Sequence, residues 1–258
     1  MRTVAIDWSG RASNAEKSIW IAEVADDQLV FLENGRGRVE VANVLIEWAA
    51  ASPNLLIGLD FAFSFPAWFL TERGMSTVQD LWMAAASNGN DWLAACEWPF
   101  WGRPGKRKPD LDGRAHFRAT EEVVPATAGI RPKSVFQIGG AGAVGTGSIR
   151  GMATLHHLST RGFSIWPFDP PTWPRVIEIY PRLLTGSVRK SSTERREAYL
   201  SARGIRAAQG LLDRAASTED AFDAAVSALV MWEHATELVQ LPQATDGITL
   251  LEGAIWYA

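Results

Sequence analysis

The segment "TEDAFDAAVSALV", residues 218–230, carries Asp220 and Asp223 in a run that is otherwise almost entirely apolar. At the helical repeat of about 3.6 residues, the two carboxylates share one narrow arc, and apolar side chains cover most of the remaining circumference. A helix that is apolar nearly all round is usually buried, and a buried carboxylate is costly unless it is paired or bound to metal. Two interpretations stay open. In the first, Asp220 is favoured at the start of the helix by the helix dipole, and Asp223 is a polar group with its hydrogen bonds satisfied. In the second, the two aspartates bind a cation.

Three more acidic residues occur in or after apolar segments. Asp7 follows "VAI", Asp60 follows "IGL", and Glu178 lies inside "VIEIY". In an open sheet covered by helices, ligand sites form at the carboxyl ends of the strands. Carboxylate oxygens are the ligands that Mg²⁺ and Mn²⁺ prefer. We therefore expect Asp7, Asp60 and Asp223 to lie within several Å of one another, with Asp220 and Glu178 in the same cleft.

The elements that must position these acids follow an α/β pattern. The first 63 residues predict a strand over 2–8, a hairpin of 18–24 with 28–33, a helix over 39–52 and a buried strand over 55–63. The later chain predicts a helix over 150–162, strands over 163–168 and 175–181, two helices within 193–214, the Asp-bearing helix and a short strand in 252–258. We expect one domain over residues 1–258, with helices on both faces of its sheet.

Residues 66–146 interrupt this pattern and are expected to form a helical and loop insertion over the carboxyl ends of the strands. Residues 66–112 contain five of the twelve tryptophans and end in the basic loop "GRPGKRKPD". Its cations, Arg103, Lys106, Arg107 and Lys108, follow Trp98, Phe100 and Trp101. Such a mixture suits phosphate contacts and base stacking. It also suits a solvated loop beside a packed aromatic cluster.

The order of four motifs resembles a known pattern. "VAIDWSG", "IGLDFAF", "VIEIYPRLL" and "EDAFDAAVSALV" are similar to the ribonuclease H-like superfamily, and in particular to an uncharacterised bacterial family of predicted nucleases related to Holliday-junction resolvases. The terminal "LEGAIW" also fits that family. Residues 66–170 carry no part of the resemblance.

The resemblance implies a mixed five-stranded sheet ordered around the first strand, with an antiparallel hairpin at its edge. It also implies that Asp7, Asp60, Asp220 and Asp223 bind two metal ions, Mg²⁺ or Mn²⁺, with Glu178 at a further family position. Two such ions activate water and stabilise the leaving oxygen in phosphodiester hydrolysis. Ser9 and Arg11, in the turn after the first strand, and Arg182, after the Glu178 strand, are expected to contact substrate phosphate.

Other functional interpretations stay open. Actin-like sugar kinases share the ribonuclease H-like core and hold ATP phosphates at an acid followed by a small-residue turn, which "DWSGR" resembles. A non-catalytic protein could also keep the fold. "GAGAVG", residues 140–145, follows a possible strand over 134–138 and matches a dinucleotide-binding fingerprint. The glycines of "TGSIRG" argue against a regular helix there, so we expect a flexible loop near the site instead.

Composition limits the partners and the compartment. The formal net charge is −4, so any nucleic-acid partner must be held by a local basic patch. Cys96 is the only cysteine, which excludes an internal disulfide and a zinc site built from cysteines. No apolar run reaches the roughly 18 residues of a membrane span, and the first residues do not resemble a signal peptide. We expect a soluble, cytoplasmic protein without a membrane partner.

Overall fold

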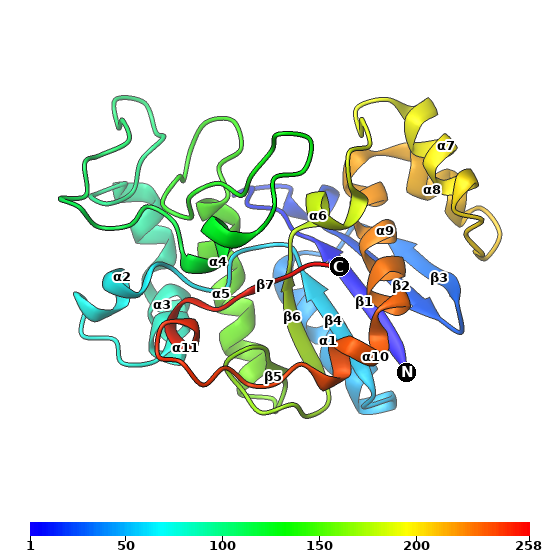
Figure 1. Ribbon diagram of the computed structural model, residues 1–258, viewed down its shortest axis with the longest axis horizontal. Coiled ribbons are helices and arrows are strands. Elements are labelled where there is room, and N and C mark those ends of the chain that lie inside the picture. The colour runs from blue at the N-terminus through cyan, green and yellow to red at the C-terminus, as the bar shows by residue number, and fades with distance from the viewer.

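The computed structural model describes residues 1–258, and a mixed β-sheet lies at its centre (Figure 1). Five strands of five or six residues form the body of the sheet: β1 (Arg2–Asp7), β2 (Trp20–Ala25), β3 (Gln28–Glu33), β4 (Leu55–Leu59) and β6 (Arg175–Ile179). Two strands of two residues complete it: β5 (Ser164–Ile165) and β7 (Ile255–Trp256). Each of the seven strands predicted for the α/β pattern exists at least in part, and the sheet has seven strands rather than five.

The sheet order is β3-β2-β1-β4-β6-β5, and β7 also pairs with β6. The pairs β1–β2 and β2–β3 are antiparallel, whereas β1–β4 and β4–β6 are parallel. This confirms that the first strand is internal and that residues 175–179 form a strand. The segment expected to be a strand over 163–168 keeps only β5, because Pro167 has no N–H to donate to a ladder.

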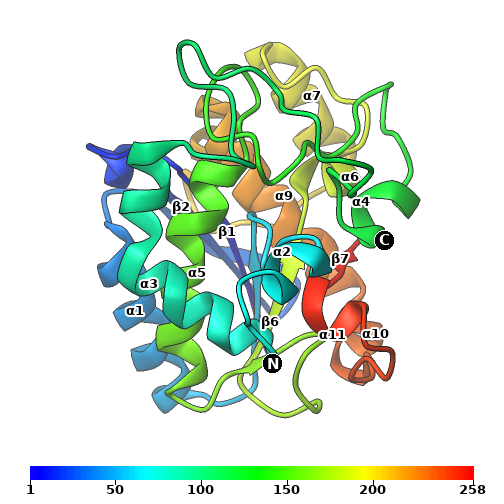
Figure 2. The same ribbon diagram turned by 90° about the vertical axis from the view of Figure 1, so that its left-hand side faces the viewer.

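Helices cover both faces of the sheet (Figure 2). The longer ones are α1 (Arg38–Ala51), α3 (Val78–Ala95), α5 (Gly145–Ser159), α7 (Thr193–Ala202) and α9 (Glu219–Glu233). The shorter ones are η1 (Ala15–Lys17), α2 (Ala67–Thr71), α4 (Ala119–Val123), α6 (Pro181–Thr185), α8 (Leu211–Ser217), α10 (Ala235–Gln240) and α11 (Thr249–Glu252). Helices α1, α3 and α5 lie on one side of the sheet, and α9 packs on β1 and β2 from the other.

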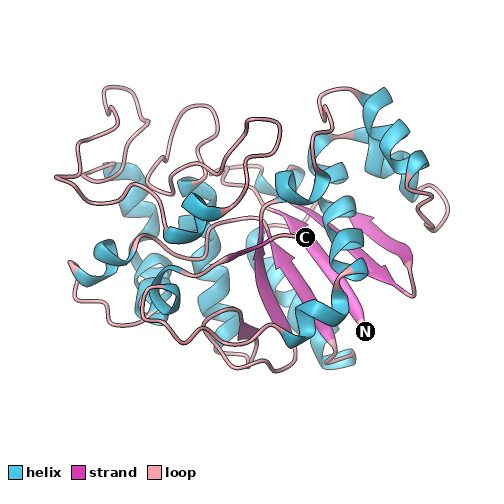
Figure 3. Ribbon diagram, in the orientation of Figure 1, coloured by secondary structure: helices cyan, strands magenta, loops and turns pink.

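The segment between β4 and α5 contributes both packing and loops. Helix α3 packs along α5, and the long loops of this segment gather at one end of the molecule (Figure 3). Phe65, Phe69 and Phe136 stack at centroid distances of 4.4 to 5.4 Å, and Phe100 is 6% exposed. Trp98, by contrast, is 43% exposed. The aromatic cluster is therefore mostly core, which favours the packing interpretation over base stacking for every member except Trp98.

The glycine-rich segment differs from its expectation. Residues 134–138 form no strand and make only the isolated bridge between Gln137 and Trp101. Helix α5 begins at Gly145, five residues earlier than expected. A Cβ at this position would lie 2.0 Å from the Val135 carbonyl oxygen, so only glycine fits there. Glycine allows this backbone contact, so the extra glycines do not delay the helix. Without a preceding strand, the dinucleotide fingerprint loses the strand–turn–helix context on which it depends.

None of the helices has the length and apolar character needed to span a membrane. Cys96 is buried and free, so the chain forms no internal disulfide.

Candidate functional site

Asp7 and Asp60 lie side by side at the carboxyl ends of two parallel strands. The register pairs Ile6 with Leu59, and the Asp60 backbone N–H donates to the Ile6 carbonyl over 3.1 Å. Side chains alternate along β1, so that Ile6 packs into the core beneath α5 and Ala5 packs into the core beneath α9. Asp7 shares the face of Ala5 and is therefore directed to the α9 side of the sheet.

Helix α9 brings the other two aspartates to the same place. Its start is capped by Thr218, whose Oγ1 accepts a hydrogen bond of 3.0 Å from the Ala221 backbone N–H. Further along, the Thr3 hydroxyl of β1 donates to the Ala228 carbonyl over 3.0 Å, which fixes the helix along the strand. Asp220 and Asp223 occupy the first turns of α9, above the end of β1. Asp223 is 8% exposed, as is Asp7.

The four carboxylates influence one another's ionisation. Burial raises the pKa of Asp7 well above its ordinary value, and the charges of Asp60 and Asp223 raise it further. Burial also raises the pKa of Asp60 to about 8, with added repulsion from Asp223. The pKa values of Asp220 and Asp223 are raised by burial as well. The aspartates thus form one electrostatic unit in which a full set of negative charges is unfavourable.

One cation that the sequence did not reveal lies within this unit. The Lys190 ammonium is paired with Asp223 Oδ2, and the two side chains are only 10% and 12% exposed. Lys190 also lowers the pKa of Asp7, Asp60 and Asp220. The other carboxylate oxygen of Asp223 is buried without a hydrogen-bond partner. One ammonium therefore pairs with one of four interacting carboxylates, and an oxygen of that same carboxylate is left without a donor.

Glu178 has a different environment. Its register partner on β4 is Leu59, so its side chain lies on the α5 face of the sheet, opposite to α9. There Arg118 donates to both of its oxygens, at 2.8 and 2.5 Å, and the Phe63 backbone N–H donates over 2.8 Å. Arg118 itself is 1% exposed and also binds Glu121. The Glu178 carboxylate is thus fully engaged in holding the insertion to β6, and its role as a ligand stays a prediction.

A cavity of about 190 Å³ lies beside Glu178 and includes Asp60 among its lining residues. Insertion residues Arg118 and Lys133 line it too, and so does Val144 of the glycine-rich loop. The insertion and this loop therefore reach the carboxyl ends of β4 and β6, as expected. Asp7, Asp220 and Asp223 do not line this cavity. Asp60 therefore lies between the two groups of acids, because the charges of both Asp223 and Glu178 raise its pKa.

The residues expected to contact phosphate lie around the aspartates. The Ser9 hydroxyl is buried and accepts a bond of 3.3 Å from the Arg11 backbone N–H. The exposed Arg11 guanidinium lowers the pKa of Asp220. Arg182, in α6, lowers the pKa of Asp223 while donating to two backbone carbonyls at 3.2 and 3.0 Å. Arg11 and Arg182 are therefore close enough to the acids to act on them electrostatically.

The basic loop lies at the same end of the molecule. Its four cations, Arg103, Lys106, Arg107 and Lys108, are all exposed. Arg103 lowers the pKa of Arg150, and Arg150 in turn donates to the Gly10 carbonyl three residues after Asp7. Arg150 therefore links the basic loop to the turn that follows β1.

The arrangement brings Asp7, Asp60, Asp220 and Asp223 together and leaves Glu178 on the opposite face. No three His, Cys, Asp or Glu side chains form a group spaced to hold a metal ion. Comparison of the chain with protein-family models, with curated proteins and with solved structures finds no match. The site must therefore be judged on its own chemistry.

Proposed function

We propose that the protein is a divalent-metal-dependent nuclease that hydrolyses phosphodiester bonds. One observation carries the proposal: four carboxylates interact with one another near the ends of β1 and β4, and only one ammonium is paired within the group. Burial, with added repulsion from Asp223, raises the pKa of Asp60 to about 8. A divalent cation offsets such an excess of buried negative charge. The sheet order and the antiparallel β2–β3 hairpin support the ribonuclease H-like interpretation.

The donor set fits a hard cation by its chemistry. All four candidate ligands, Asp7, Asp60, Asp220 and Asp223, offer carboxylate oxygens, which Mg²⁺ and Mn²⁺ prefer to nitrogen or sulfur. The buried, unpartnered Oδ1 of Asp223 is a free acceptor within the set. Lys190 occupies the other oxygen of Asp223 and acts as the resident counter-charge.

The remaining residues position the substrate. When bound, the metal ions supply a nucleophilic water and stabilise the leaving oxygen. Arg11 and Arg182 hold the scissile phosphate beside the aspartates, because both already act electrostatically on them. The exposed loop cations Arg103, Lys106 and Lys108 attract the nucleic-acid backbone toward a site that would otherwise repel it.

A manganese titration tests the metal site. Calorimetry of the wild-type chain should show saturable binding of Mn²⁺, and Asp7→Asn should abolish it while leaving the circular dichroism spectrum and the melting curve of a folded protein. Asp213→Asn, which changes an exposed carboxylate of α8, is the matched control and should bind as wild type does. Absence of a saturable site in the wild type contradicts the proposal. Unfolding of Asp7→Asn favours a structural role for Asp7 instead.

Cleavage assays test the reaction. Branched, structured and single-stranded nucleic acids should be cut only when Mg²⁺ or Mn²⁺ is present, and Arg182→Ala should lower the turnover number. Slow ATP hydrolysis without nucleic-acid cleavage would instead favour the actin-like phosphotransferase interpretation. A chain that does neither is the non-catalytic alternative.

Substrate binding is tested separately with the basic loop. Replacing Arg103, Lys106, Arg107 and Lys108 by glutamine should weaken nucleic-acid binding and flatten its dependence on salt, because fewer counter-ions are released. Manganese affinity should not change. Equal binding by this variant and the wild type across a salt series would show that the loop is merely solvated surface.

A further inference from the structure

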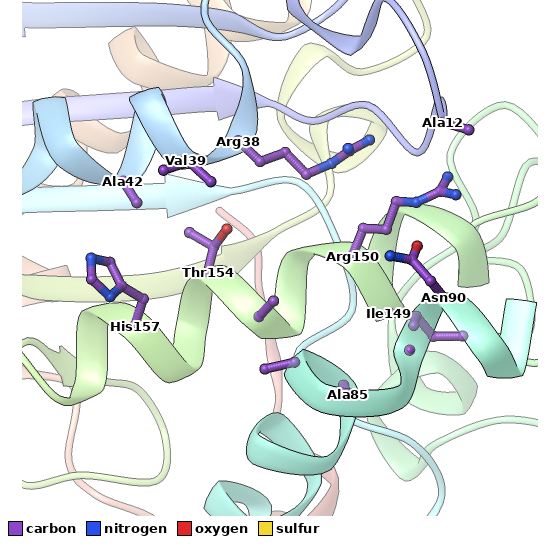
Figure 4. Close-up of a pocket in the computed structure, with 13 residues that line it drawn as sticks. Ala12, Arg38, Val39, Ala42, Ala85, Asn90, Ile149, Arg150, Thr154 and His157 are labelled. Carbon is purple, nitrogen blue, oxygen red and sulfur yellow. The ribbon is translucent and has the colours of Figure 1, made fainter.

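A second cavity lies away from the aspartates, between α1, α3 and α5 (Figure 4). Its volume is about 540 Å³. Small apolar residues form much of its wall, namely Ala42, Ala85, Gly89, Ile149 and Ala153. Its polar residues include two arginines, Arg38 of α1 and Arg150 of α5. The cavity is therefore an apolar groove with concentrated positive charge.

The two guanidinium groups lie at one end of this groove. Figure 4 shows that both extend toward the segment that carries Ala12, whereas His157 lies at the other end. Arg38 donates to the Ser9 and Arg11 carbonyls, each at 2.6 Å, and Arg150 donates to the Gly10 carbonyl. These bonds connect both arginines to the turn after β1.

Neither arginine has a carboxylate partner. All acceptors of their hydrogen bonds are neutral carbonyls, and neither residue takes part in a salt bridge. The Nε of Arg38 is buried without any hydrogen-bond partner. Burial and the charge of Arg150 lower the pKa of Arg38 to about 10, and Arg103 adds a third positive charge beside Arg150. A buried donor and uncompensated like charges at one place are unfavourable unless an anion joins them.

We propose that this cavity binds an organic phosphate monoester, with the phosphate between Arg38 and Arg150 and the organic group along the apolar wall of α5. A phosphate dianion matches the two charges, whereas a carboxylate matches one. Guanidinium groups bind phosphate oxygens through paired N–H donors. The turn carbonyls engage only Nη2 of Arg38 and Nη1 of Arg150, so each arginine keeps a further terminal nitrogen to donate. The alanine and isoleucine side chains of the wall, together with the backbone of Gly89, accommodate an apolar group of the ester.

This site does not require the metal site of the proposed nuclease, although its two arginines hold the turn that carries Ser9 and Arg11. It lies on the α5 side of the sheet, whereas Asp7, Asp220 and Asp223 lie under α9. Its ligand would be recognised whether or not a metal ion binds to the aspartates. Failure of either proposal therefore leaves the other standing.

Calorimetry with phenyl phosphate tests the site in the intact chain, with EDTA present to keep the aspartates free of metal. Phenyl phosphate should bind saturably, and more tightly than either inorganic phosphate or benzoate. Arg150→Leu should weaken it at least tenfold through loss of charge-assisted hydrogen bonds. Arg195→Leu removes an equally positive, exposed side chain of α7 outside the cavity, and it should bind as wild type does.

A second variant separates ligand binding from folding, since Arg150 also supports the turn after β1. Ala153→Phe fills the apolar wall without changing either arginine, and it should abolish binding of phenyl phosphate while the melting temperature stays close to that of the wild type. The proposal is overturned if phenyl phosphate does not bind the wild type, or if it binds Ala153→Phe as tightly. Benzoate binding equal to that of phenyl phosphate overturns the assignment of a phosphate ligand.

Discussion

Replacing Asp60 by asparagine should stabilise the metal-free protein at neutral and alkaline pH. The Asp60 side chain makes no hydrogen bond, so asparagine, which has nearly the same shape, removes the charge without removing a contact. Burial and the charge of Asp223 raise the pKa of Asp60 from 3.8 to about 8 in the folded state. Between these two pH values the folded chain keeps a proton on Asp60 that the unfolded chain has lost. The free energy of unfolding therefore falls as the pH rises from about 4 to about 8.

The size of this effect follows from the shift. At about 1.4 kcal/mol per pH unit, a shift of roughly four units corresponds to an upper bound of about 6 kcal/mol. Asp60 is partly exposed, and solvent screens its charge, so we expect about 2 kcal/mol at pH 8. For a chain of this length, about 2 kcal/mol raises the melting temperature by roughly 4–8 °C.

Thermal unfolding followed by circular dichroism in EDTA, from pH 4.5 to pH 9, measures the difference. Asp60→Asn should match the wild type at the acid end and exceed it increasingly toward pH 8. Asp213→Asn should follow the wild type throughout, because Asp213 is exposed. If Asp60→Asn and the wild type melt at the same temperature at every pH, burial and the charge of Asp223 do not raise the pKa of Asp60.

Three other substitutions test separate parts of the structure. Lys190→Met leaves Asp223 without its partner and should lower the free energy of unfolding by about 3 kcal/mol in EDTA. In Mn²⁺ the loss should be smaller, because the metal ion replaces the missing charge. Equal losses under both conditions in urea titrations would contradict a shared cation site. Arg118→Met should lower the free energy of unfolding by about 3–5 kcal/mol and make residues 100–145 accessible to limited proteolysis. A digestion pattern equal to that of the wild type would contradict this expectation. Gly10→Ala should lower the free energy of unfolding by about 1–3 kcal/mol, because its Cβ would lie 2.7 Å from the backbone of α5. Gly247→Ala is the control and should unfold as the wild type does, because its Cβ would meet nothing within 4 Å.

Much of the fold could be predicted because its elements have strong periodic patterns. Residues 55–59 are apolar throughout and form a strand buried on both faces, and residues 219–233 are apolar nearly all round and form a buried helix. The order of these elements, together with the resemblance, also indicated that Asp7 and Asp60 would end adjacent strands. The prediction failed at Gly145, because the glycines of this segment were taken as breaks in the helix. In the structure, Gly145 instead allows the helix to start close against the Val135 carbonyl.

The electrostatic partners of the acids could not be predicted. Lys190 lies in "SVRKSSTE", a polar segment that has the composition of solvent-exposed chain, and only the packing of the segment before α7 brings it to Asp223. Arg118 lies 60 positions before Glu178, with no periodic pattern to relate them. Glu178 was expected to share one cleft with the aspartates. The alternation of side chains directs it to the face opposite Asp7, and it lines a cavity with Asp60 but not with the other three.

The contacts of Arg118 also set an order of assembly during synthesis. Arg118 donates to Glu178 and to the Glu252 carbonyl, 60 and 134 residues later in the chain. The Ala67 and Ala119 backbone N–H groups donate to the Glu252 carboxylate over 2.7 and 2.6 Å. Until residue 252 has been made, this guanidinium and these amides must stay hydrated, because burying them without acceptors is costly. The nascent chain therefore emerges with its insertion undocked, and the carboxyl ends of β4 and β6 close only after translation has passed α11.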